Sequence, residues 1–364
     1  MTQYRVGIIG ATGMVGQRFI CLLENHPWFR VTYLAASARS AGKKYREAVG
    51  ERWAFDREIP AYAAEMPVND AADIDAAAEN IDFVFCAVDM KKDEIRELEE
   101  SYARHEIPVV SNNSACRGIE DVPMVVPEIN SAHLDVIDTQ RRRLGSSRGF
   151  IAVKPNCSIQ SYVPALTPLL DFGPEKVSVC TYQAISGAGK TFRTWPEMVD
   201  NVIPYIGGED EKSEQEPLKL WGHVEDLGRG KVIVNATEPV ISAQCLRVAA
   251  SDGHMAAVSV SFRDKVTKEQ ILERWNNYET EAQRLELPSA PKPFLQYFDD
   301  PSRPQTRLDR DFQNGFGVSI GRLREDRIFD WRFVCLSHNT IRGAAGGGIL
   351  TAELLCKKGY ILAR

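Results

Sequence analysis

Apolar runs alternate with amphipathic segments through the first 150 residues of the chain. Runs typical of buried strands lie near 4–9, 31–35, 82–88 and 108–111. Helical spacing of apolar positions is found near 14–24, 92–105 and 131–144. Strands and helices that alternate in this order predict a doubly wound parallel sheet.

The second half of the chain has a different pattern. From about residue 176, apolar and polar positions alternate with a period of two, as in 255–262 and 328–336, which predicts an antiparallel or mixed sheet with one wet face. A capping box opens a helical pattern that we expect to span 267–285. The Pro-rich, polar stretch 287–306 is interpreted as a surface connection.

A chain of 364 residues is too long for one ordinary core, so we expect two domains. The change of pattern places one domain at 1–150 and the other at 151–342. A last helical pattern at 344–358 is expected to pack back on the first domain, so that 343–364 completes it. The predicted fold class is α/β, with a parallel sheet beside a second, α+β domain built on a mixed sheet.

Composition and charge narrow the classes of function. The net charge is −6, and no basic stripe or aromatic-rich cationic segment favours nucleic acid. No run of eighteen apolar residues occurs and the N-terminus enters a strand at once, so we expect a cytoplasmic protein without a membrane segment. The eight cysteines form no Cys-x-x-Cys pair and no His stands at metal-ligand spacing, so neither a disulfide framework nor a metal site is indicated.

A glycine-rich turn follows the first apolar run. Gly10, Gly13 and Gly16 stand three residues apart, between a predicted strand and a predicted helix. Such a turn lets the backbone approach a pyrophosphate, whose charge the helix N-terminus stabilises. The spacing differs from the commoner Gly-x-Gly-x-x-Gly, so an ordinary tight turn is the alternative.

The loop after the second predicted strand carries no Asp or Glu that could accept a ribose 2′-hydroxyl. It offers Ser37, Arg39 and Ser40 instead, whose donors and positive charge suit a 2′-phosphate. We therefore predict NADP as the cofactor. A solvated basic loop would explain the charge but not its position.

Cys157 stands where the apolar run 150–153 has ended at Pro155 and a helical pattern begins. At a helix N-terminus, free backbone N–H groups and the dipole favour a thiolate and can hold an oxyanion beside it. We expect a nucleophile here. The alternative is a cysteine that packs as a small hydrophobe.

A Ser-Asp-Gly turn at 251–253 separates Arg247 from His254. We interpret it as the turn of a hairpin that brings the two side chains within roughly 10 Å. Arginine can hold a carboxylate with two bonds, and histidine can transfer protons near neutral pH. A plain loop histidine is the alternative for His254. The small-residue segments 183–190 and 339–348 either admit a flat ring or phosphate or allow close helix packing.

Taken together, the motifs resemble the aspartate-semialdehyde dehydrogenase family, in its archaeal and fungal branch. The resemblance spans nearly the whole chain, through motifs at 10–16, 35–43, 111–117, 155–158, 182–189, 247 with 254, and 338–347. It implies a Rossmann-type nucleotide domain and a catalytic and dimerisation domain, like those of glyceraldehyde-3-phosphate dehydrogenase. It also implies a homodimer or homotetramer, and NADP-dependent reductive dephosphorylation of L-aspartyl 4-phosphate to the semialdehyde, toward lysine, threonine and methionine.

The resemblance implies roles for individual residues. Cys157 would be the nucleophile, His254 the acid and base, and Gln183 the residue that orients the acyl group. Residues implied to bind substrate are Arg117 at the phosphoryl group, Arg247 at the α-carboxylate, Asn156, and the pair Glu209 and Lys212, for which Glu216 and Lys219 are the alternative. Residues implied to bind the cofactor are Gly10, Thr12, Gly13, Met14, Val15, Ser37, Arg39, Ser40, Ser186, Gly187 and, at the nicotinamide, Asn339.

The chain departs from the family pattern at 87–89, 158–161 and 346–349. The last of these also resembles archaeal malonyl-CoA reductase, which shares the fold, thiol and NADP but takes a CoA thioester. That enzyme is the alternative function. A non-catalytic nucleotide-binding module with a packed Cys157 is an alternative from another class.

Overall fold

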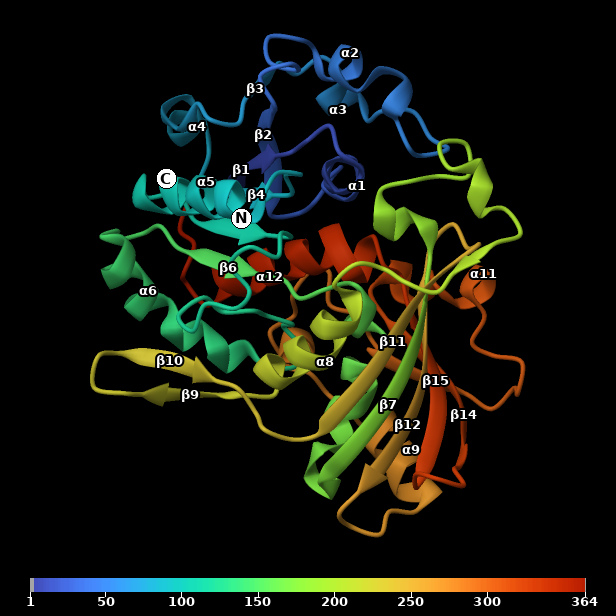
Figure 1. The fold of residues 1–364 in the computed structure, drawn as a ribbon. Helices are drawn as coiled ribbons and strands as arrows, with labels where there is room; N and C mark the ends of the chain where they lie inside the picture. The colour runs from blue at the N-terminus through green and yellow to red at the C-terminus, as the bar shows by residue number, and fades with distance from the viewer. Residues whose placement is uncertain (1–2, 364) are drawn as a thin grey trace.

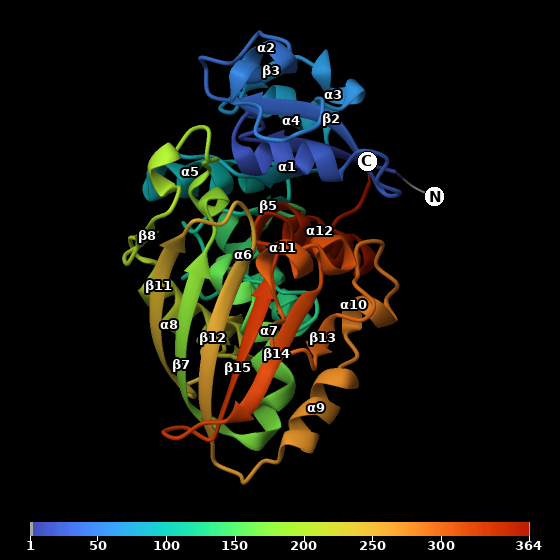
Figure 2. The ribbon, with the colours of Figure 1, turned by 90° about the vertical axis from the view of Figure 1, so that its right-hand side faces the viewer.

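The computed structural model describes residues 3–363, which build two large β-sheets and the helices that cover them (Figures 1 and 2). The first sheet has six parallel strands in the order β3-β2-β1-β4-β5-β6. Their bounds are β1 Tyr4–Ile9, β2 Phe29–Ala36, β3 Val68–Asp70, β4 Phe83–Cys86, β5 Val109–Ser111 and β6 Ile151–Val153. The predicted doubly wound sheet is confirmed. Its order reverses between β1 and β4, where sheets of this kind bind ligands.

Helices cover both faces of this sheet. They are α1 Met14–Leu22, α2 Tyr45–Val49, α3 Ala61–Ala64, α4 Ile74–Asn80, α5 Lys92–Arg104, α6 Ile137–Leu144 and α12 Gly346–Lys357. Ile8 packs with Phe19 of α1 and Leu350 of α12 on one face. Ile9 belongs to a second cluster with Ala103 of α5 on the other face. The alternation of strand side chains thus places the last helix of the chain on the first sheet.

The second sheet is mixed, with seven strands in the order β13-β14-β15-β12-β7-β11-β8 (Figure 2). Its strands are β7 Pro174–Gln183, β8 Val202–Ile203, β11 Val240–Val248, β12 His254–Phe262, β13 Leu295–Phe298, β14 Val318–Glu325 and β15 Trp331–Ser337. The remaining elements are α7 Val163–Leu166, α8 Glu209–Leu220, α9 Lys268–Asn276, α10 Glu281–Arg284, α11 Thr306–Asp309 and the hairpin of β9 His223–Asp226 with β10 Lys231–Val234. The mixed sheet expected from the period-two pattern is therefore present.

The predicted hairpin between β11 and β12 is wrong. β7 lies between these two strands, parallel to β11 and antiparallel to β12. The turn at 251–253 therefore links two strands that are not neighbours in the sheet. Turn residues only indicate that the chain reverses, and they cannot show that a strand from earlier in the sequence fills the gap.

Two further predictions need correction. The expected helix over 267–285 is two helices, because α9 ends at Asn276 and a second capping box, Thr280 with Gln283, starts α10. The stretch 287–306 is not only a connection, because it contains β13, which pairs in parallel with β14. In both places, pairing and capping within the fold outweigh the composition of the segment.

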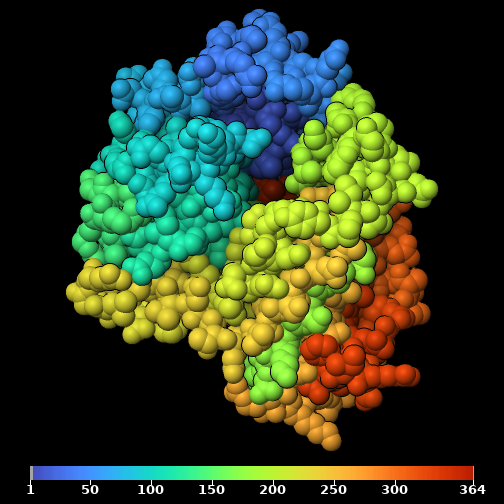
Figure 3. All heavy atoms as spheres, viewed as in Figure 1, coloured from blue at the N-terminus to red at the C-terminus, as the bar shows by residue number. Residues whose placement is uncertain are grey.

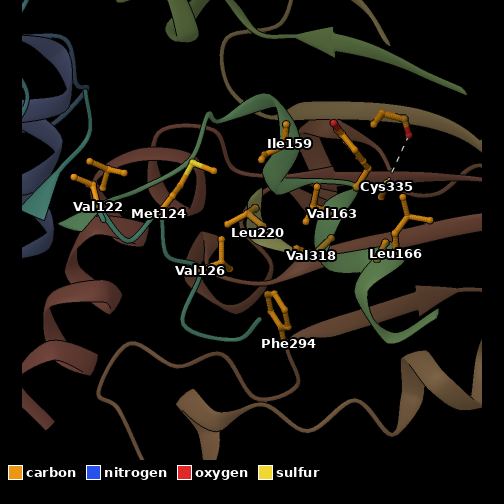
Figure 4. Close-up of a cluster of buried hydrophobic side chains, with 14 of the residues drawn as sticks. Val122, Met124, Val126, Ile159, Val163, Leu166, Leu220, Phe294, Val318 and Cys335 are labelled. Atoms are coloured by element: carbon orange, nitrogen blue, oxygen red, sulfur yellow. Dashed lines mark hydrogen bonds between the residues drawn. The ribbon is translucent and has the colours of Figure 1, made fainter. Parts of the chain in front are cut away.

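One buried cluster joins the two parts of the molecule. It contains Val109 and Val153 of the first sheet, and Val179 and Val318 of the second. Figure 4 shows side chains of the connecting segments, among them Met124 and Val163, which meet in this cluster. Because Cys157 lies on the path from β6 into this core, its backbone is fixed relative to both sheets. Within residues 3–363, no helix is long and apolar enough to cross a membrane.

Candidate active site

Cys157 follows β6 and is the N-cap of a three-residue 3-10 turn, Ser158–Gln160. The expected helical start after the thiol is therefore only this short 3-10 turn, and the first α-helix, α7, begins at Val163. Burial raises the pKa of the Cys157 thiol, the carboxylate of Glu209 raises it further, and Lys154 is the strongest of the cations that lower it. A 3-10 turn of three residues has only a small dipole to favour the thiolate. Nearby cations must do this instead.

His254 is the partner of the thiol. Its Nε2 lies 3.4 Å from Cys157 Sγ, and its Nδ1 accepts a hydrogen bond of 3.0 Å from the backbone N–H of Ala184. Because a backbone N–H can only donate, Nδ1 carries no proton and the neutral ring must carry its proton on Nε2. Burial and the nearby Arg247 lower the pKa of His254 to about 3. The imidazole is thus neutral and directs an N–H at the sulfur.

Three predicted site residues lie side by side across the second sheet. Gln183 at the end of β7 is in register with Arg247 of β11 and with His254 of β12. All three are buried, with exposed fractions of 1%, 6% and 0%. The Arg247 guanidinium donates from Nη1 to Ala184 O at 2.8 Å, and the Gln183 amide donates to Thr181 Oγ1 at 3.2 Å. The predicted closeness of Arg247 and His254 holds, but it arises through β7 and not through a hairpin.

A loop of small residues covers this row. Gly187 lies in the 3-10 turn Ile185–Ala188, and a Cβ added there would lie 2.8 Å from Arg247 Nη1 and 3.0 Å from His254 Nε2. Asn339 holds the loop: its Nδ2 donates to Ser186 Oγ, and its Oδ1 accepts from the Gly253 N–H, both at 2.8 Å. Asn339 therefore fixes two loops at the site, and glycine at 187 lets them close over the row.

Helix α8 brings two acidic residues to the Cys157 turn. Glu209 Oε1 accepts from Asn156 Nδ2 at 2.9 Å and from Lys212 Nζ at 2.8 Å. Glu216 accepts from Arg117 Nη1 at 2.8 Å and from the Asn156 N–H at 2.5 Å. Asn156 Oδ1 in turn accepts from the Ser158 N–H at 2.7 Å. The two carboxylates thus fix Asn156 and the turn that carries the thiol.

The two acid and base pairs of α8 have different surroundings. Lys219 Nζ donates to the carbonyls of Arg117, Ile119 and Val122 at 2.7, 2.7 and 3.0 Å, so its donors are used within the fold. The Lys212 side chain is 30% exposed, and within residues 3–363 its ammonium group forms a hydrogen bond to Glu209 alone. Lys212 is therefore the lysine of the two that is placed to meet a ligand.

Sequence reasoning did not identify Lys154 or Arg342 as members of the site, and it named Glu216 only as the alternative to Glu209. Arg342 forms a buried ion pair with Glu128, with Nη2 2.9 Å from Oε2. This pair anchors the segment in which Gly343 packs on Cys157, since a Cβ at 343 would lie 2.8 Å from Cys157 Cβ. The adjacent arginine and glycine within the 338–347 motif were the feature of the sequence that could have predicted this packing.

The glycine turn after β1 has the shape that a diphosphate needs. Gly10 has a φ of +87°, and a Cβ there would lie 2.3 Å from Ala87 O, while one at Gly16 would lie 2.3 Å from Gly10 O. At Gly13 a Cβ would meet only Gly10 O, at 3.6 Å. Gly13 caps α1 without a side-chain hydrogen bond, which leaves the first N–H groups of the helix, on Met14 and Val15, without a capping side chain, as an anion site requires. Thr12 lies in the same turn.

The residues predicted to meet a 2′-phosphate follow β2. Ser37 and Arg39 are exposed, whereas Ser40 is buried and its N–H donates to Ser37 O at 2.8 Å. Within residues 3–363, no carboxylate forms an ion pair with Arg39. The space-filling view shows a hollow between the blue N-terminal lobe and the yellow-green segment, with dark red C-terminal atoms at its floor (Figure 3).

Both parts of the chain match known domain families. Residues 5–137 match the family described as semialdehyde dehydrogenase, NAD binding domain, and residues 166–342 match semialdehyde dehydrogenase, dimerisation domain. The chain thus has a nicotinamide-nucleotide-binding domain and a domain through which such proteins associate. Within residues 3–363, no cluster of three or more His, Cys, Asp or Glu could hold a metal ion.

Whole-chain relatives agree with the domain matches. The aspartate-semialdehyde dehydrogenase of Schizosaccharomyces pombe is 46% identical over 366 residues, which cover 99% of this chain and 100% of the relative. That of Archaeoglobus fulgidus is 43% identical over 361 residues, with 99% and 100% covered. The crystal structure of the Candida albicans enzyme with NADP superimposes with a TM-score of 0.88 at 39% identity, covering 99% of this chain and 100% of that chain.

Sequence identity over the full length, the two domain matches and the shared fold lead to one assignment, which the sequence motifs had already indicated. The chain belongs to the aspartate-semialdehyde dehydrogenase family.

Proposed function

We propose that the chain catalyses the NADP-dependent conversion of L-aspartyl 4-phosphate to L-aspartate 4-semialdehyde and phosphate, and the reverse reaction. The observation that carries this proposal is the 3.4 Å contact between Cys157 Sγ and His254 Nε2, at a thiol whose pKa the nearby Arg247 and Arg117 lower. A thiol in contact with a neutral imidazole N–H suits covalent catalysis. Arginines beside it suit a substrate with both a carboxylate and a phosphoryl group.

The charges and positions of the side chains suggest which of them binds each group of the substrate. Arg247, fixed at Ala184 O, has further guanidinium donors for a bidentate hold on the α-carboxylate. Glu209 is the carboxylate suited to the α-ammonium group, and Lys212 and Arg117 are the cations for the phosphoryl oxygens. Asn156 keeps the turn in place under the acyl carbon.

The first step forms a thioester. The Cys157 thiolate attacks the acyl carbon, a C–S bond forms, and the C–O bond to phosphate breaks so that phosphate leaves with its electron pair. The His254 Nε2–H and nearby backbone N–H groups hold the oxyanion formed in this step. Gln183, level with His254 on β7, orients the acyl group.

The second step reduces the thioester. When bound, NADPH supplies the hydride that the acyl carbon accepts. His254 hydrogen-bonds the resulting oxyanion through Nε2–H, and collapse of this adduct breaks the C–S bond, releasing aldehyde and restoring the thiolate. Covalent catalysis thus divides the reaction into two steps at one sulfur.

The residues proposed to bind the cofactor have the shape and charge that NADP requires. Gly10, Thr12, Gly13, Met14 and Val15 form the turn for the diphosphate, since a Cβ at Gly10 would clash and one at Gly13 would stand in the open approach. The exposed Arg39, with Ser37 and Ser40, is suited to the 2′-phosphate. Residues proposed at the nicotinamide end are Ser186, Gly187 and Asn339, which close over His254.

We also infer the organisation of the molecule. Residues 1–150 with 343–364 form the NADP-binding unit and 151–342 the catalytic and dimerisation unit, because α12 packs on the first sheet. The dimerisation family match and exposed apolar side chains such as Val202 and Tyr205 support a homodimer or homotetramer, which light scattering would size. We also propose that the enzyme is cytoplasmic.

A product assay tests the function. The purified chain should reduce NADP with aspartate semialdehyde and phosphate, and it should not oxidise NADPH with malonyl-CoA. Alkylation of Cys157 by iodoacetamide should abolish this activity, and substrate should slow the alkylation. Turnover of malonyl-CoA alone would assign the chain to the CoA-thioester reductases instead. Full activity after complete alkylation of Cys157 would exclude a thioester mechanism.

A further inference from the structure

Lys154 is a buried cation beside the thiol that the reaction described above does not use. It follows the last residue of β6, and its backbone N–H donates to Ser111 O at 2.9 Å. Its exposed fraction is 3%, and its ammonium group donates to the carbonyl of the adjacent Pro155. In the part of the chain that the structure describes, no carboxylate lies within ion-pair distance of Lys154. A buried ammonium without a carboxylate is costly unless an anion forms nearby.

Lys154 and Cys157 are covered by the same backbone segment. A Cβ at Gly347 would lie 3.7 Å from Lys154 Cδ, and a Cβ at Gly343 would lie 2.8 Å from Cys157 Cβ. Both glycines belong to the segment that the Arg342–Glu128 ion pair anchors. Because this cover buries Lys154 and leaves Cys157 only partly exposed, the charge of one acts on the other with reduced screening.

The charged groups that act most strongly on Lys154 and on Cys157 are largely the same. Those acting on Lys154 are Arg117, Cys157, Glu216 and Glu209, and burial with the like charge of Arg117 lowers the pKa of Lys154 to about 7. Those acting on Cys157 are Glu209, Lys154, Arg247 and Arg117. Glu216 is already paired with Arg117, and Glu209 with Lys212. A negative sulfur would therefore be the anion left for Lys154.

His254 does not provide this positive charge. Its Nδ1 accepts a hydrogen bond from the Ala184 N–H, so a proton at Nδ1 would place two donors against each other. A thiolate–imidazolium pair, in which histidine carries the compensating charge, is thus disfavoured in this fold. The compensating charge has to come from a group that is cationic near neutral pH.

We propose that Lys154 is a positioning residue that supplies the buried positive charge on which the reactive thiolate of Cys157 depends. The proposal rests on the function proposed for Cys157. Lys154 acts through its charge and not by transferring a proton to substrate. When the thiolate forms, the opposite charge in turn favours protonated Lys154, so the two groups hold each other in the charged state.

The test is the pH dependence of Cys157 alkylation by iodoacetamide, measured by mass spectrometry of the Cys157 peptide in the full-length protein. The thiolate attacks the reagent carbon, a C–S bond forms and iodide leaves, so the rate follows the thiolate fraction. The reagent is uncharged, so Lys154 cannot attract it. In Lys154→Met the rate at pH 7 should fall about tenfold or more, because losing a nearby opposite charge shifts a pKa by at least one unit.

Two variants control for other effects of the substitution. Lys154→Arg keeps the charge and should keep the rate within about threefold of the parent, less than half a pKa unit. Lys176→Met makes the same chemical change at an exposed position of β7 and should leave the profile unchanged. Superimposable profiles for Lys154→Met and the parent would overturn the proposal, as would an equal shift in Lys176→Met.

A further variant serves if Lys154→Met does not fold. His254→Gln removes the ionisable ring but keeps an amide N–H near the sulfur, with Lys154 intact. Its alkylation rate at pH 7 should stay within about threefold of the parent. A fall of about tenfold or more would mean that the imidazole carries the charge, and the proposal would be overturned. The assay needs no substrate, so its outcome is separate from the product assay that tests the proposed function.

Discussion

Replacing Gly187 by alanine should damage catalysis without unfolding the protein. The backbone at Gly187 is not in the left-handed region, so alanine brings no strain of its own. Its Cβ would lie 2.8 Å from Arg247 Nη1, 3.0 Å from His254 Nε2 and 3.1 Å from His254 Cε1. Contacts this short force the neighbours apart. Neither can move freely, because Ala184 O holds Arg247 and the Ala184 N–H holds His254.

The size of the effect follows from the thiol contact. The imidazole must shift by roughly half an ångström, which displaces Nε2 from its 3.4 Å contact with Cys157 Sγ. Since a misplacement of about 1 Å can cost about 10²-fold in rate, half of that shift should lower kcat/KM roughly tenfold, or about 1.4 kcal/mol in transition-state stabilisation. Steady-state kinetics with aspartate semialdehyde, NADP and phosphate measure this loss.

Gly189→Ala is the matched control in the same loop. Gly189 has a φ of +67°, and a Cβ there meets nothing within 4 Å. Alanine should therefore cost about 1 kcal/mol in folding stability through backbone strain, while kcat/KM stays near that of the parent. If Gly187→Ala gave the same kinetics as Gly189→Ala, the loop would not be packed on Arg247 and His254, and the reasoning would be refuted.

Three further predictions concern the surroundings of the thiol and the cofactor. Glu216→Gln should lower the free energy of unfolding by about 3 kcal/mol in urea melts, because it breaks a buried ion pair with Arg117 and turns an amide N–H toward a donor. The control Glu211→Gln, at an exposed position of the same helix, should lower it by under about 1 kcal/mol. Equal losses in the two variants would mean that the Glu216–Arg117 pair does not stabilise the fold. Arg247→Lys should lower kcat/KM for the semialdehyde roughly 10- to 100-fold through the loss of charge-assisted bonds, and unchanged kinetics would place the carboxylate elsewhere. Arg39→Glu should lower the ratio of kcat/KM for NADP to kcat/KM for NAD by about tenfold or more. The control Lys43→Glu, in the same loop, should change this ratio less. Equal ratios for Arg39→Glu and the parent would mean that Arg39 does not contact the 2′-phosphate.

Patterns of neighbouring residues were enough to predict the parts of the site that are formed by one continuous segment of the chain. The turn from Gly10 to Gly16 could be predicted because the strand, the glycines and the helix are contiguous. The position of Cys157 after a strand could be predicted for the same reason. The helix expected after Cys157 is broken into short pieces, and Pro164 and Pro168, which open α7 and the following 3-10 turn, were the signal against it.

The rest of the site depends on contacts between distant segments. The sequence contains both Arg247 and His254, but not the insertion of β7 between their strands. It contains the pairs Glu209 with Lys212 and Glu216 with Lys219 at equal spacing, so only the fold shows that Lys219 is fully used by backbone carbonyls. Lys154 stands in the cysteine motif, yet its burial without a carboxylate partner is a property of the folded chain.

The place of β7 between β11 and β12 also bears on how the enzyme becomes active during folding. Both outer strands come much later in the chain than the strand that separates them, so their alignment requires the closure of large loops, which is slow compared with forming a local hairpin. A collapsed intermediate with native-like helices would still lack the row of Arg247, Gln183 and His254. Recovery of turnover after dilution from denaturant should therefore lag behind the recovery of helical circular dichroism, and enzymatic activity reports completion of this sheet.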